Sequence, residues 1–295
     1  SGFIGSNLVK FISKKYGNNK VIRISKSKSI KKKKKNYYKI NLKNKDRLIN
    51  LKFEKIDTAY ICAGNPKTFV KNKFEGKIQI DENRKIIKNI ILFCKKNKVK
   101  KLIFLSSSAV YNKKNKYPLS ENQEINPKTF LGYAKKINEK QLKRFSQNSN
   151  TKVLILRIFT VYGKGMRKDQ FIHQLRNKIR NNKQVLLWNK ETFRNFILID
   201  DLVRIIDILA NKTKKKYNII NVGTNKSFKI KYIYEKLSKI INKKRKLYFA
   251  SNNNNFDHFV KISKLKNEIK NFKFTNIVDG LKECIKYAKS IILIK

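Results

Sequence analysis

Long apolar runs with little polar alternation mark several segments of the chain as buried strands. Residues 99–105 read Val-Lys-Lys-Leu-Ile-Phe-Leu, and residues 56–64 and 151–163 have the same character. A parallel strand that is covered on both faces loses the alternation of polar and apolar positions. Shorter strands are predicted at 21–24 and 185–188, and another follows Arg194 directly.

Helical spacing of apolar residues separates these strands. Residues 83–97 carry Ile86, Ile90 and Phe93 on one helical face, and residues 8–12, 171–181 and 230–242 give further helices. Alternating strands and helices indicate an α/β protein whose parallel sheet is doubly wound and whose crossovers are right-handed.

Composition changes this picture little. The 295 residues carry a formal net charge of +54, which alone would suggest a polyanion-binding protein. Lysine is spread over nearly every expected surface, including the run Lys31–Lys35, and is accompanied by abundant Asn and Ile. Codon drift in an AT-rich genome explains this better than a specific nucleic-acid footprint. A clustered basic stripe with interleaved aromatic residues is absent from the sequence.

The three cysteines lie far apart, and neither His173 nor His258 has metal-ligand spacing, so the sequence predicts no disulfide framework and no metal site. No apolar run reaches the ~18 residues that a membrane span needs. A reducing cytoplasm is the expected location.

The chain begins with Ser-Gly-Phe-Ile-Gly, in which Gly2 and Gly5 have the spacing of the last two glycines of G-x-x-G-x-x-G. Such a loop brings the backbone and a helix N-terminus close to a pyrophosphate. The strand that normally precedes the loop is expected to be missing. Alone, two glycines are also compatible with an ordinary turn.

A second group of polar residues follows the strand at 99–105. Ser106, Ser107 and Ser108 stand at its carboxyl end, where open α/β sheets bind their ligands. A helix that carries Lys135 and Glu139 begins after a loop with two prolines. We therefore expect a hydroxyl cluster and a lysine to face one pocket.

Residues after the second strand bear on the cofactor. An NAD site should have a ribose-binding acid there, but Ser25 and Lys26 occupy this place and suit the 2′-phosphate of NADP. Because lysine is so abundant, Lys26 is equally compatible with drift. The strand at 56–64 ends in Ala63 and Gly64, small residues that let a cofactor lie against the backbone.

Together these motifs resemble the extended short-chain dehydrogenase/reductases, in particular the NAD-dependent epimerase/dehydratases that act on nucleotide sugars. Four motifs occur in order along almost the whole chain: Asn83 with Asn89, Ser-Ser-Ser-Ala-Val-Tyr at 106–111, Leu-Arg-Ile-Phe-Thr-Val-Tyr-Gly at 156–163, and Phe-Arg-Asn-Phe-Ile-Leu-Ile-Asp-Asp at 193–201.

The resemblance implies a Rossmann-like domain over residues 1–163, to which residues 193–223 return, and a smaller α/β domain over 164–295 that binds the nucleotide sugar. It implies NAD or NADP as cofactor and a reaction most like that of UDP-glucose 4-epimerase. It assigns catalysis to Ser107 and Lys135. Whether the chain forms a homodimer is left open.

Binding residues follow from the same resemblance. The cofactor would be held by residues of the glycine loop, of the second-strand end, of the small-residue strand end and of two helices: Gly2, Phe3, Ile4, Gly5, Ser25, Lys26, Ala63, Gly64, Asn83 and Lys135. The substrate would be held by Ser107, Ser108, Thr160 and Arg194. An arginine next to apolar residues needs an anion, so Arg194 binds either a carboxylate or a ligand phosphate.

One position departs from the family pattern. The helix reads Leu131-Gly132-Tyr133-Ala134-Lys135, which resembles Y-G-Y-A-K, so that Leu131 stands where the family has its acid/base tyrosine. Either Tyr133 reaches in from the next turn, or the protein binds its ligands without efficient turnover. The alternatives are therefore a nucleotide-sugar epimerase/dehydratase and a binding protein that kept the fold.

Overall fold

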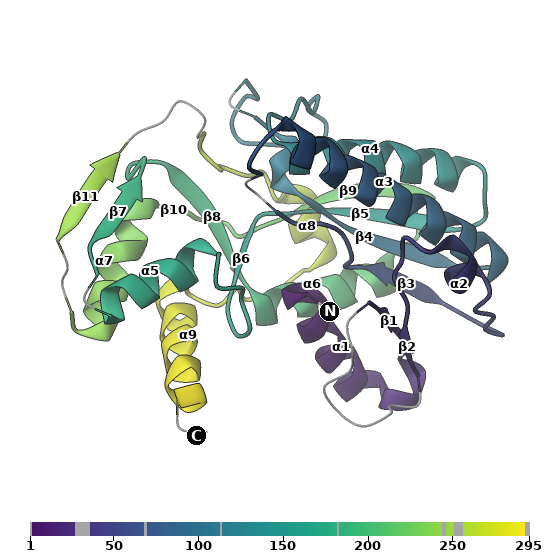
Figure 1. Ribbon diagram of the computed structural model, residues 1–295, viewed down its shortest axis with the longest axis horizontal. Coiled ribbons are helices and arrows are strands. Elements are labelled where there is room, and N and C mark those ends of the chain that lie inside the picture. Colours follow the sequence, from purple (N-terminus) through teal and green to yellow (C-terminus); the bar gives the residue numbers. More distant parts are fainter. Residues whose placement is uncertain are drawn as a thin grey trace. The chain divides into compact units, whose positions relative to one another are not determined.

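Apolar runs between residues 58 and 222 form a four-stranded sheet with the order β3-β4-β5-β9 (Figure 1). Its strands are β3 (Thr58–Ile61), β4 (Lys101–Ser107), β5 (Lys152–Ile158) and β9 (Tyr217–Val222). Strand β4 pairs in parallel with both β3 and β5. Residues 102–106 and 153–158 are all buried. This burial on both faces explains why these strands read as continuous apolar runs.

Two long helices, α3 (Lys73–Lys96) and α4 (Phe130–Gln147), pack side by side along this sheet (Figure 1). Polar caps fix where they begin. The Asn72 side chain accepts the Glu75 N–H at 2.9 Å, and the Thr129 hydroxyl accepts the Gly132 N–H at 3.1 Å. The helix predicted at 83–97 therefore starts ten residues earlier than its apolar spacing suggests.

Helix α1 (Phe3–Tyr16) and helix α6 (Ile199–Lys212) are joined by a buried carboxylate. Asp207, 1% exposed, accepts the Lys15 ammonium at 2.5 Å and the Tyr16 hydroxyl at 2.9 Å. A carboxylate this deeply buried requires such partners. The contact fixes α1, and with it the glycine loop, against the rest of its unit.

The remaining elements at this end of the chain are short. Strands β1 (Arg23–Ser25) and β2 (Tyr37–Lys39) form a separate parallel pair. The sequence predicted the first of them, two residues early, and missed the second. The helical pieces are η1 (Asn18–Lys20), α2 (Lys45–Ile49) and η2 (Ser108–Val110).

This computed structural model describes residues 2–26, 36–67, 70–112, 114–181, 183–243, 246–250 and 256–292. The predicted loop at Lys31–Lys35 lies outside them. The chain divides into two units, the first made of residues 1–115, 121–158 and 203–221, and the second of 116–120, 159–202 and 222–295. No described helix is long and apolar enough to cross a membrane.

The second unit is built on two small sheets. Strands β6 (Thr160–Tyr162), β8 (Phe193–Leu198) and β10 (Ser227–Lys229) form one with the order β10-β8-β6, in which β8 is parallel to β6 and antiparallel to β10. Strands β7 (Val185–Trp188) and β11 (Leu247–Ala250) form a parallel pair. The helices are α5 (Phe171–Arg180), α7 (Ile230–Ile241), α8 (Ser263–Glu268) and α9 (Ile277–Ile292).

Two predicted strands need correction. The run 151–163 is two strands rather than one, because the chain passes from β5 in the first unit to β6 in the second at Phe159. The Phe159 N–H still donates to the Val222 carbonyl of β9 at 3.1 Å, with the same residue offset as the Val153 bond to Lys216, so the pairing of β5 with β9 extends up to this break. Arg194 lies within β8 and not before it. The apolar pattern could not show the break at Phe159, since both flanks of it are apolar, and it could not place Arg194 inside a strand, since the polar Asn195 follows it.

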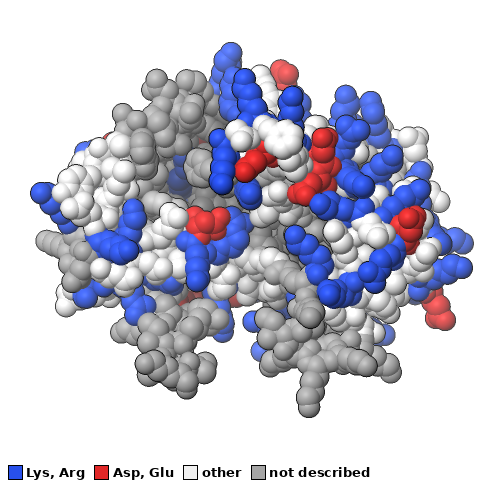
Figure 2. Space-filling model, viewed as in Figure 1, with Lys and Arg blue, Asp and Glu red and all other residues white. Residues whose placement is uncertain are grey.

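Lysine and arginine side chains are scattered over the visible face of the molecule, with a few acidic groups between them (Figure 2). No single stripe gathers them on that face. This distribution agrees with the even spread of lysine along the sequence.

Candidate functional site

The glycine loop forms the start of α1. Gly2 is the N-cap residue, and no side chain of the described residues caps this helix end. Phe3 and Ile4 are the first helical residues and are half-buried. A Cβ added to Gly2 would meet nothing within 4 Å, whereas one added to Gly5 would lie 3.1 Å from the Cys62 Cβ. Gly5 thus lets α1 approach the end of β3, and Gly2 leaves the helix N-terminus open.

The loop after β3 is held by a buried amide. Asn83, 2% exposed, accepts the Asn65 N–H at 3.1 Å and donates to the Asn65 carbonyl at 3.3 Å. A Cβ on Gly64 would come within 2.6 Å of the Asn83 Oδ1. Ala63 is half-buried beside it. Asn83, predicted to bind the cofactor, therefore holds the loop in its conformation. Position 64 must be glycine because a side chain there would collide with the Asn83 amide.

Ser25 and Lys26 lie at the end of β1. Ser25 is 8% exposed, and its carbonyl accepts the Ile40 N–H at 3.0 Å. Lys26 is exposed. The pKa of Glu82 is lowered mainly by a hydrogen bond from Lys43, and the charge of Lys26 adds to this effect.

The three serines at the end of β4 do different things. Ser106 is buried and donates to the Glu139 carboxylate at 2.5 Å. Ser107 is half-buried, and its hydroxyl oxygen accepts the Ala109 N–H at 3.1 Å, which leaves its own proton to donate. Ser108 is buried and begins η2. Only Ser107 combines a fixed oxygen with partial exposure.

Helix α4 presents Leu131 and Lys135 on one face, since they are four residues apart. Both are half-buried. Tyr133 is 43% exposed, and helical geometry turns it about 200° from each of them. A Cβ on Gly132 would lie 2.2 Å from the Ala109 carbonyl oxygen, so the helix begins in direct contact with η2.

Lys135 points to the end of β4. Its Nζ donates to the Leu105 carbonyl at 2.7 Å and lies 4.6 Å from the centre of the Phe104 ring. Burial of the ammonium lowers the pKa of Lys135 to about 8, although the Glu139 carboxylate and the Cys62 thiol act to raise it. Burial likewise raises the pKa of Cys62 to about 12, against the opposing effect of Lys135.

These contacts bring several predicted residues together within the first unit. Cys62 touches Gly5 and interacts electrostatically with Lys135. The carbonyl that holds Lys135 belongs to Leu105, two residues before Ser107. The glycine loop, the lysine and the serine hydroxyl therefore gather at the carboxyl ends of β3 and β4.

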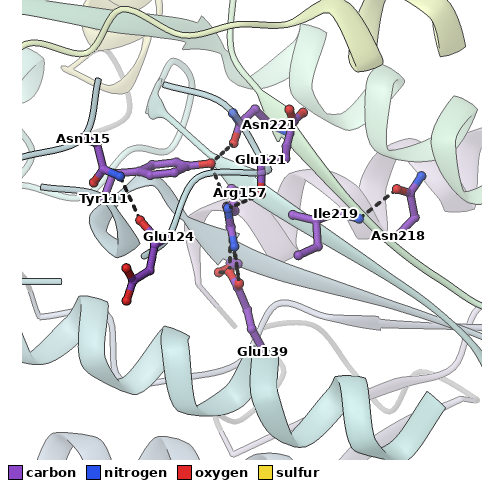
Figure 3. A network of polar contacts seen from close by, with 10 residues as sticks. Tyr111, Asn115, Glu121, Glu124, Glu139, Arg157, Asn218, Ile219 and Asn221 are labelled. Atoms are coloured by element: carbon purple, nitrogen blue, oxygen red, sulfur yellow. Dashed lines mark hydrogen bonds and ion pairs between the residues drawn. The ribbon is translucent and has the colours of Figure 1, made fainter. Parts of the chain in front are cut away.

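Behind these residues lies a buried polar network centred on Arg157 of β5 (Figure 3). Its guanidinium contacts the Glu139 carboxylate at 2.9 Å, the Tyr111 hydroxyl at 2.9 Å and the Glu121 carbonyl at 3.3 Å. Tyr111 in turn donates to the Asn221 Oδ1 at 2.9 Å. Burial lowers the pKa of Arg157, but Glu139 and Tyr111 raise it more. The network fixes α4 against β4 and β5.

Sequence reasoning gave Arg157 no role, although the signal was present. An arginine inside an apolar strand needs an anion, which is the argument applied to Arg194. Glu139 was recognised only as the acid that follows the lysine. The same oversight applies to Asp207, a carboxylate on the apolar face of α6.

The remaining two predicted residues belong to the second unit. Thr160 is half-buried at the start of β6 and pairs with Phe196 of β8. Arg194 of β8 donates through Nη1 to the Phe256 carbonyl and, at 3.4 Å, to that of Phe193. Burial lowers its pKa, and the Asp257 carboxylate and Tyr117 act against this.

Comparison with known proteins identifies the arrangement. The sequence profile of the NAD dependent epimerase/dehydratase family matches residues 1–223. The chain belongs to this family. Its members are NAD-dependent enzymes, as the order of motifs along the chain predicted. The family assignment also confirms the predicted α/β fold.

Two relatives are similar to this chain over most of its length. An uncharacterized protein of Methanocaldococcus jannaschii is 29% identical over 84% of this chain and 81% of its own length. The dTDP-D-glucose 4,6-dehydratase of Dictyostelium discoideum is 29% identical over 76% of this chain and 57% of its own. Both lie in the range expected for divergent members of one family.

Two solved structures share the fold of nearly the whole chain. One is the UDP-glucose 4-epimerase of Thermotoga maritima with UDP-glucose, with a TM-score of 0.85, 19% identity, and coverage of 99% of this chain and 97% of that one. The other is the UDP-glucuronic acid 4-epimerase of Bacillus cereus with UDP-glucuronic acid and NAD, with a TM-score of 0.84, 24% identity, and coverage of 98% and 97%.

Proposed function

We propose that this protein binds NAD and a UDP-sugar and acts as a nucleotide-sugar epimerase or dehydratase of the UDP-glucose 4-epimerase type. The observation that carries the proposal is the gathering of the α1 N-terminus, Lys135 and Ser107 at the carboxyl ends of β3 and β4. Ligands of open α/β sheets bind at this edge. Family membership supplies the reaction class.

The residues present fit NAD. The open turn at Gly2 presents backbone N–H groups and the positive end of the helix dipole to a pyrophosphate. The Gly64 loop, held by Asn83, has no room for a side chain and gives the cofactor a flat backbone surface. When bound, NAD accepts a hydride from the sugar and returns it. NADP is the competing cofactor, because the ammonium of Lys26 suits its 2′-phosphate.

The chain's own residues would orient the sugar and move its proton. Ser107 has a hydroxyl proton to donate, so it suits a hydrogen bond to the reacting sugar oxygen. Lys135 supplies a buried amine beside it. In the second unit, Arg194 has guanidinium nitrogens other than Nη1 for a ligand phosphate, and Thr160 contributes a hydroxyl.

A second candidate is a protein that binds both ligands with little turnover. The specific observation in its favour is Leu131, whose side chain cannot take a proton. Tyr133 is a poor substitute, since it lies on another face of α4 and is largely in solvent. The two candidates share the same binding site and differ only in rate.

Replacing Leu131 tests the proposal. Leu131→Tyr restores the family's phenol one turn before Lys135, and general acid/base help is worth about 10²- to 10⁴-fold in rate. We expect a gain of up to that order in a coupled assay with UDP-glucose, while NADH binding, followed by fluorescence, stays unchanged.

Leu131→Phe is the matched control, because it adds the ring without the hydroxyl and should give no gain. Tyr133→Phe should leave the wild-type rate unchanged. Substantial wild-type turnover that Tyr133→Phe abolishes would show that Tyr133 is the base. Failure of the chain to bind either NADH or a UDP-sugar would refute the proposed function itself.

A further inference from the structure

Position 131 has no phenol that could accept the proton in the proposed reaction. A titratable group, the amine of Lys135, lies on the same face of α4. We infer that Lys135 itself exchanges the proton with the reacting sugar hydroxyl, in place of the tyrosine that the family uses. This inference rests on the proposed function and assigns the lysine a direct catalytic role.

Geometry holds the amine where such a role needs it. The Lys135 Nζ is fixed by one hydrogen bond, to the Leu105 carbonyl at 2.7 Å, and by the Phe104 ring. Leu105 lies two residues before Ser107, so the amine stands at the same strand end as the hydroxyl that would orient the sugar. A neutral amine that donates to Leu105 still has its lone pair for a proton.

The surroundings favour the neutral amine more than an ordinary surface site does. Three elements face Lys135: α4 with Glu139, the end of β3 with Cys62, and β4 with the Phe104 ring and the Leu105 carbonyl. Glu139 is the carboxylate among these groups, and it is already bound by Arg157 at 2.9 Å (Figure 3) and by Ser106 at 2.5 Å.

The consequence is a base that is available near neutral pH. With a pKa of about 8, roughly one Lys135 in ten is neutral at pH 7, against fewer than one in a thousand for a lysine at ~10.4. A positive charge bound nearby, such as that of an oxidised nicotinamide, would lower the value further.

The proton transfer balances without another reactant. In the oxidative half the sugar O–H bond breaks, an N–H bond forms on Lys135, and the hydride passes to the cofactor as described above. In the reductive half the ammonium returns its proton to the sugar oxygen. Lys135 ends as it began, and the epimerisation consumes no net proton.

The first test measures the amine directly. The full chain is treated with limiting acetic anhydride at pH values from 6 to 11, and acetylation of Lys135 is quantified by mass spectrometry against a lysine peptide added to the same reaction. We expect the Lys135 curve to have its midpoint about two pH units below that of the peptide, and NADH to protect Lys135. A midpoint equal to that of the peptide would overturn the inference.

The second test separates proton transfer from binding. Lys135→Arg keeps a cation but cannot accept a proton near neutral pH. We expect this variant to bind NADH and UDP-glucose and to lose about 10²- to 10⁴-fold of the wild-type kcat. The wild-type kcat should rise about tenfold per pH unit in the acidic range and level off at or below pH 8, because kcat reports the pKa with the cofactor bound.

Three outcomes contradict the role of Lys135. These are an unchanged kcat in Lys135→Arg, a wild-type rate that does not vary between pH 6 and pH 8, and a wild type that binds both ligands but shows no turnover at any pH. Each leaves the proposed binding of NAD and sugar nucleotide intact, whereas loss of both binding signals in the wild type would refute the proposed function.

Discussion

Two arginines on strands, the buried Arg157 of the first unit and the half-buried Arg194 of the second, have opposite surroundings. Arg157 of β5 is bonded to a carboxylate, a phenol and a main-chain carbonyl. Arg194 of β8 donates only to two main-chain carbonyls, and no carboxylate among the described residues lies within ion-pair distance of it. The charge of Arg157 is satisfied by a bonded carboxylate, whereas Arg194 has only the more distant charge of Asp257 beside it. We therefore expect Arg157 to serve stability, and we propose that Arg194 serves ligand binding.

The largest effect is expected from removing Arg157. Arg157→Met should lower the free energy of unfolding by about 3–5 kcal/mol, because the buried Glu139 carboxylate is left unpaired. Urea unfolding followed by circular dichroism measures this. The double variant Arg157→Met with Glu139→Met should be more stable than the single one, since no unpaired charge remains. A double variant no more stable than Arg157→Met would contradict the ion-pair explanation.

Removing Arg194 should affect binding instead. Arg194→Ala should weaken UDP-glucose binding by about 1.5–3 kcal/mol, the range for a hydrogen bond to a charged group, or roughly 10- to 150-fold in Kd. Isothermal titration calorimetry measures this.

Arg167 provides the control, because it is an exposed arginine of the same unit that already pairs with Asp169 at 2.8 Å. Arg167→Ala should leave the affinity unchanged. If Arg194→Ala instead keeps the affinity and lowers the thermal stability, Arg194 is structural like Arg157 and the contrast disappears.

A smaller, pH-dependent effect involves His258. Burial, and next the charge of Arg194, lowers the pKa of His258 to about 3, from about 6.5 in the unfolded chain. Between these values the unfolded state binds a proton that the folded state does not, so stability falls as the pH falls from 6.5 towards 3. The slope is at most about 1.4 kcal/mol per pH unit.

Urea midpoints at pH 7, 6 and 5 test this prediction, with His258→Asn as the reference that lacks the titrating group. Arg194→Ala should reduce the slope, because it removes one cause of the lowered pKa. An equal pH dependence in the wild type and His258→Asn would show that His258 is not protected from protonation.

Local patterns in the sequence predicted much of the fold. The strand predicted at 99–105 lies at 101–107, two residues later. The strand predicted at 185–188 and the helices predicted at 171–181 and 230–242 agree with the structure to within one residue, because apolar periodicity is determined by neighbouring residues. The start of α3 was missed because a polar cap and a polar first turn define it. The change of sheet at Phe159 was missed because both sides of it are apolar.

Only the part of the candidate site that depends on local motifs could be predicted from the sequence. The glycine spacing and the serine cluster are local motifs, and the helix repeat placed Leu131 and Lys135 on one face. The Arg157–Glu139 pair joins residues 18 apart, and the Lys15–Asp207 pair joins residues 192 apart. Such pairings depend on how the chain folds back, which one sequence does not reveal. The two-carbonyl environment of Arg194 is likewise a tertiary property.

The contact between Gly132 and the Ala109 carbonyl limits how this protein could regain a phenol at its reaction centre. With 2.2 Å between a hypothetical Cβ and that oxygen, no residue with a side chain fits at position 132, so a rotation of α4 that brought another residue to this place would make it collide with the Ala109 carbonyl. Bringing Tyr133 to the face of Lys135 would require a turn of about 160°. A substitution at position 131 therefore remains the way to place a phenol one turn before Lys135 while the helix keeps its register.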